Sequence, residues 1–422
     1  MPTLDAFASR YYDIPPSVML KVDLLRHGVR LGSAPLGTRH FHHHDESGQR
    51  AVDPRAHLQG SIELADGTCV FVSHNPSSPY AVQADPESGQ IALQEGSRNE
   101  FICHLKSGPR FAWTRARTAR QTPMAAVLTP SLGGSCGPLA CFLLRYCEFV
   151  SATEQCRFCS WVGMGKSHEL RPDVEDFRET LRAIWDEQRA IGYLAFSGGS
   201  LFNRAKEADA FLRYLNAVKE TNLPLPATVA AIQALDKPDS RRLREAGFDC
   251  VCYSMEVWEE KAWSAILPGK TRSVGRTSWM RCLSDAVEVF GAGHVLCNFV
   301  AGVETTLPDL YSSPEAAAES TLAGMRWCYE QGVYPKYAVW ITGGGALLGS
   351  CPPAPLDYYA RLLRGRQQLF AEFPMAIPPT DCPRCLTQSC EADLSRLDSA
   401  RYGLGPASAE AWEGRHSMAH CF

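Results

Sequence analysis

Three cysteines in the middle of the chain have the spacing of ligands to a metal centre. Cys147 is followed by Cys156 and Cys159, which have two residues between them. A Cys-x2-Cys pair lets two thiolates reach one metal centre, and a cysteine nine positions upstream completes a set of three. Three thiolates on a four-iron cluster leave one iron open to a substrate or cofactor, whereas structural sites use four protein ligands. We therefore expect Cys147, Cys156 and Cys159 to hold a chemically active 4Fe-4S cluster.

Other interpretations of these cysteines stay open. Cys156 and Cys159 could instead be zinc ligands or a redox pair. Cys136 and Cys141 compete with Cys147 for the position of the first ligand. We favour Cys147 because it lies at the end of a predicted strand, and the active sites of parallel barrels are built where strands end and loops begin.

A second group of cysteines lies near the C-terminus. Cys382, Cys385 and Cys390 have the spacing Cys-x2-Cys-x4-Cys, and Cys421 follows at a distance. Four thiolates suit either an auxiliary iron–sulfur cluster or a structural zinc ion, and the spacing itself does not choose between these and no metal. The remaining cysteines lie mostly in apolar strand or helix patterns, where burial as small hydrophobic side chains is expected: Cys69, Cys103, Cys250, Cys252, Cys282, Cys297, Cys328 and Cys351.

The composition limits the class of protein. The chain has 422 residues, a formal net charge of −4, 45% hydrophobic residues and 21% charged residues. Disordered and collagen-like chains are excluded, and the near-neutral balance argues against a nucleic-acid or membrane partner. The sequence has no apolar run near the ~20 residues that a membrane span needs, and its start lacks the basic-then-apolar layout of a signal peptide. We expect a cytoplasmic location, where the cysteines stay free of disulfides.

Two kinds of pattern follow each other along the chain. Residues 1–110 show no clean helical repeat and are predicted to form strands and turns, for example around 68–72 and 90–93. The run from His40 to His44 is interpreted as an exposed loop, with metal or substrate contact as the alternative. From about residue 124, short apolar runs alternate with amphipathic helical stretches, which is typical of βα units around a parallel sheet.

The predicted fold class is therefore α/β, with a partial (β/α)6 TIM-type barrel. Strands are expected at roughly 142–147, 193–198, 227–233, 250–257, 294–303 and 337–342, and helices at 174–191, around 211–218, and at 238–247, 279–290, 314 onward and 356–370. We divide the chain into an N-terminal extension rich in strands and loops (1–123), the barrel (124–371) and a Cys-rich tail (372–422). The extension and the tail are expected to cap the mouth of the barrel.

The order of these features resembles the radical S-adenosylmethionine (radical SAM) superfamily, and in particular its biotin-synthase-like members. The family's usual cluster motif is Cys-x3-Cys-x2-Cys with an aromatic residue just before the last cysteine, and Phe158 occupies that place. The eight residues between Cys147 and Cys156 depart from this motif. The resemblance covers roughly residues 140–350.

The resemblance also implies which residues would hold SAM. The segment from Ser197 to Ser200 is similar to the family's Gly-Gly-Glu segment, whose backbone meets the methionyl amine, with Ser200 in place of the acid. Glu256 is similar to an acid that lies by the SAM ribose or methionyl group, and the fifth strand looks like the segment that packs on the adenine. The implied cofactor-binding residues are Phe158, Ser197, Gly198, Gly199, Ser200, Glu256, Asn298, Ala301, Gly302 and Val303. Gln233 and Lys270 are interpreted as structural or solvated polar residues at the same end of the barrel.

The chemistry that the resemblance implies is reductive cleavage of SAM. One electron from the cluster would give methionine and a 5′-deoxyadenosyl radical, which abstracts hydrogen from a substrate. The implied substrate is a small molecule, a cofactor precursor or a natural-product intermediate, with a peptide as the alternative, and the implied electron donor is a protein such as flavodoxin or ferredoxin. Three other functions stay open: a 3-amino-3-carboxypropyl radical made from SAM, a zinc-stabilised barrel hydrolase or lyase, and a non-enzymatic iron–sulfur scaffold.

Overall fold

The computed structural model describes residues 2–31, 59–84, 91–96, 100–105, 111–130, 139–159, 171–188, 191–224, 227–342, 345–380 and 389–402. Its centre is a seven-stranded sheet in the order β13-β12-β11-β10-β9-β8-β7. The strands from β8 to β13 pair in parallel, and β7 (Thr129–Pro130) pairs antiparallel with β8. The six parallel strands are β8 (Leu139–Leu144), β9 (Leu194–Gly198), β10 (Thr228–Ala231), β11 (Cys250–Cys252), β12 (Val295–Ala301) and β13 (Tyr334–Val339).

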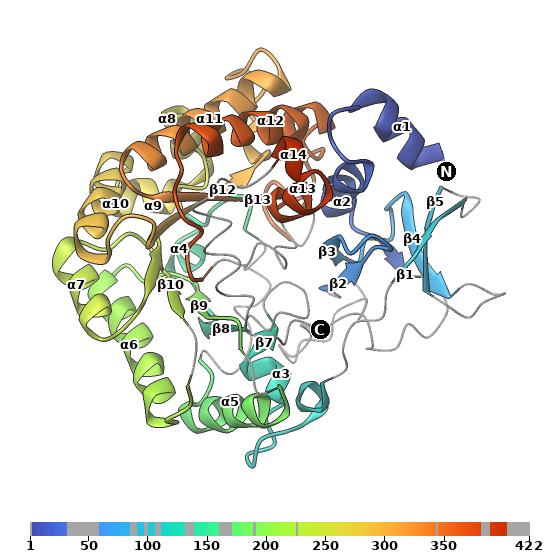
Figure 1. Ribbon diagram of the computed structural model, residues 1–422. Coiled ribbons are helices and arrows are strands. Elements are labelled where there is room, and N and C mark those ends of the chain that lie inside the picture. The colour runs from blue at the N-terminus through green and yellow to red at the C-terminus, as the bar shows by residue number, and fades with distance from the viewer. Residues whose placement is uncertain are drawn as a thin grey trace.

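Helices follow the parallel strands and form an arc around them (Figure 1). Asn203, Asp236 and Ser313 cap three of these helices by accepting a hydrogen bond from a backbone amide in the first turn. The helices that follow strands in the barrel are α4 (Glu148–Ser151), α5 (Val174–Gln188), α6 (Arg204–Glu220), α7 (Lys237–Glu245), α8 (Glu260–Ile266), α9 (Pro268–Ser273), α10 (Arg276–Phe290), α11 (Pro314–Glu330) and α12 (Leu356–Glu372). This alternation confirms the predicted partial TIM-type barrel.

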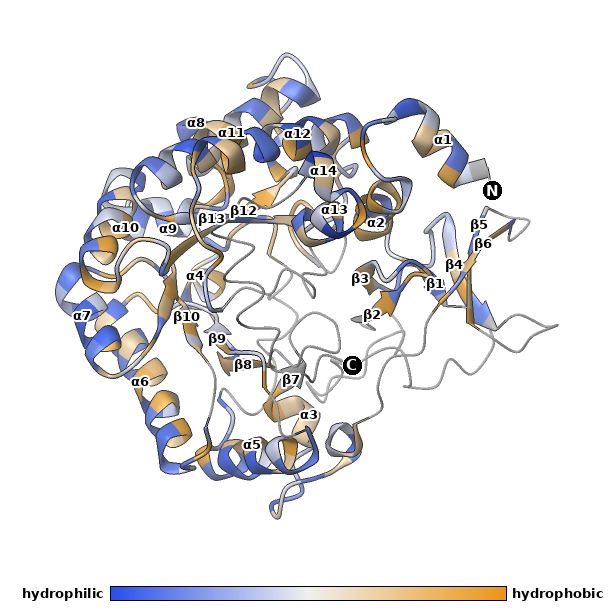
Figure 2. Ribbon diagram, in the orientation of Figure 1, coloured by the Kyte–Doolittle hydropathy of each residue, from blue (hydrophilic) through white to orange (hydrophobic). Residues whose placement is uncertain are grey.

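Two faces of the parallel strands are buried in different cores. The face toward the helices belongs to the main core, in which Phe299 lies against Gly324 of α11. The other face contributes to a separate small cluster of Val229, Cys250 and Leu296 from three neighbouring strands and Tyr193, which directly precedes β9. These four side chains form a layer inside the barrel, as expected for strands whose residues alternate between the interior and the helices. Figure 2 shows the apolar strands inside the arc and polar residues on the outer helices.

Two predicted strands differ from the observed ones in a way that affects the site. β8 ends at Leu144, so Cys147 lies three residues beyond the strand and not at its end. β11 ends at Cys252, five residues earlier than predicted. The chain continues from it to an isolated bridge between Glu256 and Phe299, and Glu256 has a left-handed φ of 66°. The backbone of Glu256 is therefore bent out of the strand direction.

The prediction that residues 1–110 contain only strands and turns is wrong at the N-terminus. α1 (Pro2–Arg10) and α2 (Pro16–His27) lie there. Seven residues of α2 are buried, and they lie on several sides of the helix, so the helical period does not stand out in the sequence. Strands follow as predicted: β1 (Arg30–Leu31), β4 (Tyr80–Ala84), β5 (Ile91–Glu95) and β6 (Glu100–His104) form one sheet, and β2 (Gln59–Glu63) and β3 (Cys69–Ser73) another.

The short helical segments η1 (Ala112–Arg115) and α3 (Met124–Val127) lead from this extension into the barrel. Within the described part of the chain, no helix is both long enough and apolar enough to span a membrane.

The described part of the tail starts at the amino end of the strands. After α12, Met375 lies 3.7 Å from the position of a β-carbon on Gly293, which precedes β12, and Thr380 contacts Cys250 at the start of β11. The short helices α13 (Glu391–Leu397) and α14 (Ser399–Tyr402) then lie near α2 and α12 (Figure 1). Thus residues 375–380 lie at the amino end of the strands. The tail was expected to cap the barrel mouth, which is at the opposite end.

Candidate functional site

The three predicted cluster ligands lie on one segment after β8, at the carboxyl end of the strands. Cys147 precedes α4 as its N-cap residue. Cys156 and Cys159 lie in a turn in which the Cys159 amide donates to the Cys156 carbonyl at 2.9 Å, and Phe158 between them packs on the main core. All three residues are partly exposed, and none of them is in a disulfide. Of the rival first ligands, Cys141 is fully buried within β8, and Cys136 lies outside the described residues.

Gly199, directly after β9, fixes the position of Cys147. A β-carbon on Gly199 would lie 1.9 Å from the Tyr146 carbonyl oxygen and 2.7 Å from the Cys147 β-carbon. The Gly199 amide donates to the Leu144 carbonyl at 2.8 Å, and the Glu148 amide donates to the Ser200 carbonyl at 2.8 Å. Only glycine permits this approach of two backbones. The segment Ser197–Ser200, predicted to meet SAM, therefore lies directly against the first predicted cluster ligand.

The second half of the cysteine segment is attached to the corner between α8 and α9. The Arg157 amide donates to the Ile266 carbonyl at 2.9 Å, and the Gly269 amide donates to the Glu154 carbonyl at 3.0 Å. A β-carbon on Gly269 would lie 2.6 Å from that same carbonyl oxygen. Cys156 is thus held by hydrogen bonds on both of its sides.

The Cys156 thiol of this segment has a shifted pKa. Burial raises the pKa of the Cys156 thiol to about 12, Lys270 opposes this shift, and Glu256, Cys159 and Cys147 add to it. As a free thiol, Cys156 is therefore neutral near pH 7, and a metal must displace its proton to bind. Among the described residues, no three His, Cys, Asp or Glu side chains are grouped closely enough to hold one metal ion. Ligands of a 4Fe-4S cluster bind different irons, so they stand farther apart than ligands of one ion.

Glu256 and Lys270 form a buried ion pair beside this segment. The Lys270 Nζ lies 2.8 Å from Glu256 Oε1 and donates to the Ser254 carbonyl at 3.1 Å. Lys270 was interpreted as a structural or solvated residue, but it is only 7% exposed and its ammonium lies 4.5 Å from the centre of the Trp279 ring. Burial lowers the pKa of Lys270, but Glu256 and Cys156 raise it, and the net shift is upward.

The residues predicted on the fifth strand divide between two faces. Asn298 is half-buried on the face toward the barrel interior, beside its register partner Lys336 on β13. Ala301, Gly302 and Val303 are buried toward the helices. The Tyr359 hydroxyl of α12 donates to the Ala301 carbonyl at 3.0 Å and would lie 2.5 Å from a β-carbon on Gly302. The side chains of Ala301 and Val303 are occupied by packing, so a cofactor would meet this segment through its backbone.

Glu304, in the short helix η3 (Val303–Thr306), is structural. The Tyr358 hydroxyl donates to its carboxylate at 2.6 Å, and the Gly302 amide donates to it at 3.1 Å. Thr321 donates a further hydrogen bond, and burial raises the pKa of Glu304. This acid therefore joins the end of β12 to α11 and α12.

A buried acid that sequence reasoning missed connects two loops of the barrel mouth. Glu207 in the first turn of α6 is 1% exposed, and its carboxylate accepts from the Leu201 amide at 2.6 Å and from the Gln233 amide at 3.3 Å. The Gln233 side-chain amide donates to Glu207 and to the Leu201 carbonyl, while its Oε1 is buried without a partner. Burial raises the pKa of Glu207 to about 7. Only its place shortly after the Gly-Gly segment could have indicated this role.

Of the predicted tail ligands, the structure describes Cys390. It is fully buried, and its amide donates to the Tyr337 hydroxyl at 3.1 Å. Burial raises the pKa of its thiol to about 12. Cys382, Cys385 and Cys421 lie outside the described residues, as do His40 to His44.

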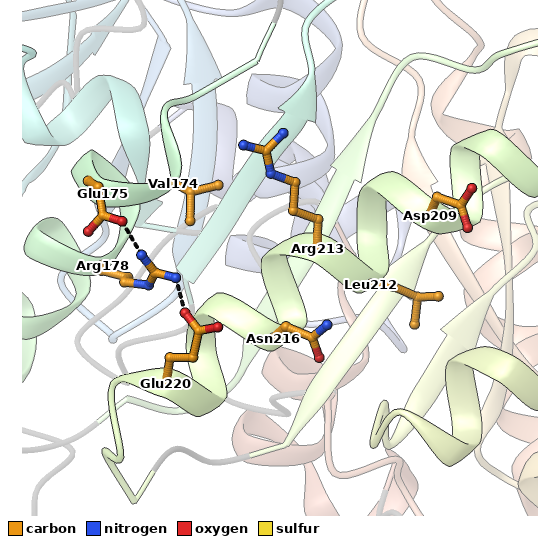
Figure 3. A pocket seen from close by; sticks show the side chains of 8 residues that line it. All are labelled: Val174, Glu175, Arg178, Asp209, Leu212, Arg213, Asn216 and Glu220. Carbon is orange, nitrogen blue, oxygen red and sulfur yellow. Dashed lines mark hydrogen bonds and ion pairs between the residues drawn. The ribbon is translucent and has the colours of Figure 1, made fainter.

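A surface pocket between α5 and α6 lies apart from all of these residues (Figure 3). Arg178 pairs with Glu175 and Glu220 at one side of it. The pocket is lined by Val174, Glu175, Arg178, Asp209, Leu212, Arg213, Asn216 and Glu220, and none of them was predicted to bind a cofactor.

Comparison with known proteins gives one curated relative. Over 341 residues, 72% of this chain and 81% of the relative, the chain is 23% identical to the bacteriochlorophyllide c C-7(1)-hydroxylase of Chlorobaculum limnaeum. No protein-family model matches the chain.

Solved structures were matched as well. A radical SAM methyltransferase from Sphaerobacter thermophilus is 14% identical, with a TM-score of 0.40, over 74% of this chain and 82% of that one. The FeFe-hydrogenase maturase HydG from Carboxydothermus hydrogenoformans is 12% identical, with a TM-score of 0.41, over 56% of this chain and 52% of that one. This chain thus spans about half of HydG.

This chain resembles the radical SAM enzymes. This agrees with the resemblance stated from the cysteine segment and the order of the strands. For a radical SAM enzyme the expected cofactors are a 4Fe-4S cluster and SAM. The three thiols on one segment, Gly199 packed against Cys147 and the buried cation that acts on Cys156 fit such a cluster.

Proposed function

We propose that this protein is a radical SAM enzyme in which Cys147, Cys156 and Cys159 hold the 4Fe-4S cluster. The observation that carries the proposal is the packing of Gly199 against Tyr146 and Cys147, which joins the predicted SAM segment to the predicted cluster segment. The bound cluster would supply one electron to SAM and yield methionine and a 5′-deoxyadenosyl radical that takes hydrogen from the substrate.

The chain's own residues would position and enclose the reactants. The backbone from Ser197 to Ser200 would meet the methionyl group of SAM, with Glu207 holding this loop through the Leu201 amide. The backbone of Ala301 and Gly302 would approach the adenine. The barrel interior beside Asn298 and Lys336 would receive the substrate and exclude water from the radical.

The substrate that we favour is a small molecule. The curated relative is named for hydroxylating a bacteriochlorophyllide, which supports a small-molecule substrate over a peptide. An electron donor such as flavodoxin or ferredoxin would reduce the cluster. We also propose that Cys382, Cys385, Cys390 and Cys421 hold a second metal centre, with an auxiliary iron–sulfur cluster favoured over zinc.

Anaerobic reconstitution with iron and sulfide tests the proposal. After reduction with dithionite and addition of SAM, methionine and 5′-deoxyadenosine should form together, and Cys147→Ala should abolish both. Cys282→Ala is the matched control, because Cys282 is buried on α10, away from the cysteine segment. Methylthioadenosine in their place would indicate a 3-amino-3-carboxypropyl radical, and bound zinc without SAM turnover would refute the proposal.

The tail centre needs a separate measurement. The double variant Cys382→Ala, Cys385→Ala should lose part of its iron and keep SAM cleavage by the first cluster. Full iron content in this variant would refute an auxiliary cluster, and loss of zinc alone would assign a structural zinc ion.

A further inference from the structure

Lys270 holds a buried positive charge between an acid and an aromatic ring. Its Nζ lies 2.8 Å from Glu256 Oε1, 3.1 Å from the Ser254 carbonyl oxygen and 4.5 Å from the centre of the Trp279 ring. The side chains of Lys270 and Glu256 are 8% and 13% exposed. Screening by solvent is therefore weak here, and each charge acts on its neighbours more strongly than at the surface.

The backbone brings this ion pair to Cys156. Gly269, the residue before Lys270, donates its amide to the Glu154 carbonyl at 3.0 Å, and Arg157 donates its amide to the Ile266 carbonyl at 2.9 Å. The two hydrogen bonds flank Cys156 on one segment, and on the other segment they end at Ile266 and at Gly269, the residue before Lys270. A β-carbon on Gly269 would lie 2.6 Å from the Glu154 carbonyl oxygen. The two segments are therefore in direct backbone contact at Gly269.

Lys270 follows directly on Gly269, whose amide contacts the Cys156 segment, so the ion pair with Glu256 starts from the backbone at this contact. Both charges of the pair are therefore anchored next to the segment that carries Cys156.

We propose that Lys270 and Glu256 set the reduction potential of the cluster held by Cys156, with Lys270 stabilising the reduced state and Glu256 limiting that effect. This inference rests on the proposed function, because it needs the cluster. Reduction adds one electron from the donor to the cluster and makes it more negative, so a nearby cation favours reduction and a nearby anion opposes it. Lys270 and Glu256 would act on the cluster through the electrostatic field of their charges, and not as ligands of its irons.

Opposite shifts from the two partners distinguish this role from a purely structural one. The midpoint potential of the reconstituted full chain is measured by EPR-monitored titration with dithionite, in the absence of SAM. Lys270→Met should shift the potential to a more negative value, Glu256→Gln to a more positive value, and Lys270→Arg should stay near the unsubstituted protein. The control is Lys237→Met, since Lys237 is exposed on α7 and pairs with Glu288, and it should leave the potential unchanged.

Each result decides the matter. Equal potentials in Lys270→Met and Glu256→Gln, or shifts in the same direction, with the iron content retained, would overturn the inference. If Lys270→Met fails to fold because Glu256 is left buried without its partner, Glu256→Gln alone decides, and an absent positive shift overturns the inference. An unsubstituted protein that takes up no cluster would refute the proposed function itself, which is a distinct result.

Discussion

Gly199 and Cys147 lie on different loops, yet a β-carbon on Gly199 would stand 2.7 Å from the β-carbon of Cys147. β8 ends at Leu144 and β9 ends at Gly198, so this contact is made by the loops that follow the two strands. The position of the first predicted cluster ligand thus depends on the absence of a side chain in a neighbouring loop.

Gly199→Ala should therefore reduce iron binding. The added methyl group would stand 1.9 Å from the Tyr146 carbonyl oxygen, so one of the two loops must move. We expect a loss of about 1–3 kcal/mol in the free energy of unfolding and a severalfold lower iron content after reconstitution. Unfolding by denaturant and colorimetric iron analysis measure the two effects.

Gly291→Ala is the matched control. Gly291 has a φ of 91° at the end of α10, and no atom lies within 4 Å of the position of its β-carbon. This variant should lose about 1 kcal/mol through backbone strain and keep its iron. Equal iron contents in the two variants would contradict the role assigned to Gly199.

Cys141→Ala should keep the cluster. The Cys141 thiol is fully buried within β8, on the face that belongs to the main core. Its removal should cost about 1 kcal/mol of stability through a small cavity and leave SAM cleavage intact. If Cys141→Ala loses its iron while Cys147→Ala retains it, the first ligand is Cys141.

The sequence predicted the barrel well because each βα unit carries its own local signals. Alternating apolar runs and amphipathic stretches are local properties, and Asn203, Asp236 and Ser313 mark helix starts. α2 was missed because its buried residues lie on several sides, and they include Lys21, which is neutralised by a residue more than 370 positions away. No local pattern contains such a partner.

The candidate site was predicted as far as its motifs are local. The Cys-x2-Cys pair and Gly198-Gly199 are visible in the sequence, but the roles of Glu207 and Lys270 depend on partners from other loops. β11 ends at Cys252, and Glu256, four residues further on, has a left-handed backbone. A run of apolar residues does not reveal such a bend.

The burial of Glu207 predicts a pH dependence of stability. Its pKa is raised by burial from 4.5 to about 7, so the folded state favours the protonated form. Its contribution to stability is full below about pH 4.5, and it is lost as the pH rises to about 7. Glu207→Gln removes this contribution, so the difference in unfolding free energy between the unsubstituted protein and the variant should shrink from pH 4.5 to pH 7. Denaturant unfolding at several pH values measures it, and a constant difference would contradict the prediction.

The ion pair between Lys21 and Asp393 should hold the N-terminal extension to the tail. Its two charged atoms lie 2.6 Å apart, and the side chains are 0% and 3% exposed, with Arg396 as a further partner of Asp393. Lys21→Met leaves Asp393 buried with one cation fewer, which should cost about 3 kcal/mol in the free energy of unfolding. The double variant Lys21→Met, Asp393→Asn removes both charges and should recover more than half of that loss.

Lys237→Met is the matched control for this prediction, because its ion pair with Glu288 is solvent-exposed. Such pairs contribute little, so the control should change stability by less than about 1 kcal/mol. Denaturant unfolding gives the energies, and limited proteolysis shows whether α13 is cleaved faster once α2 no longer carries the charge. A double variant as unstable as Lys21→Met would mean that packing of the lysine side chain, and not neutralisation of Asp393, joins the two segments.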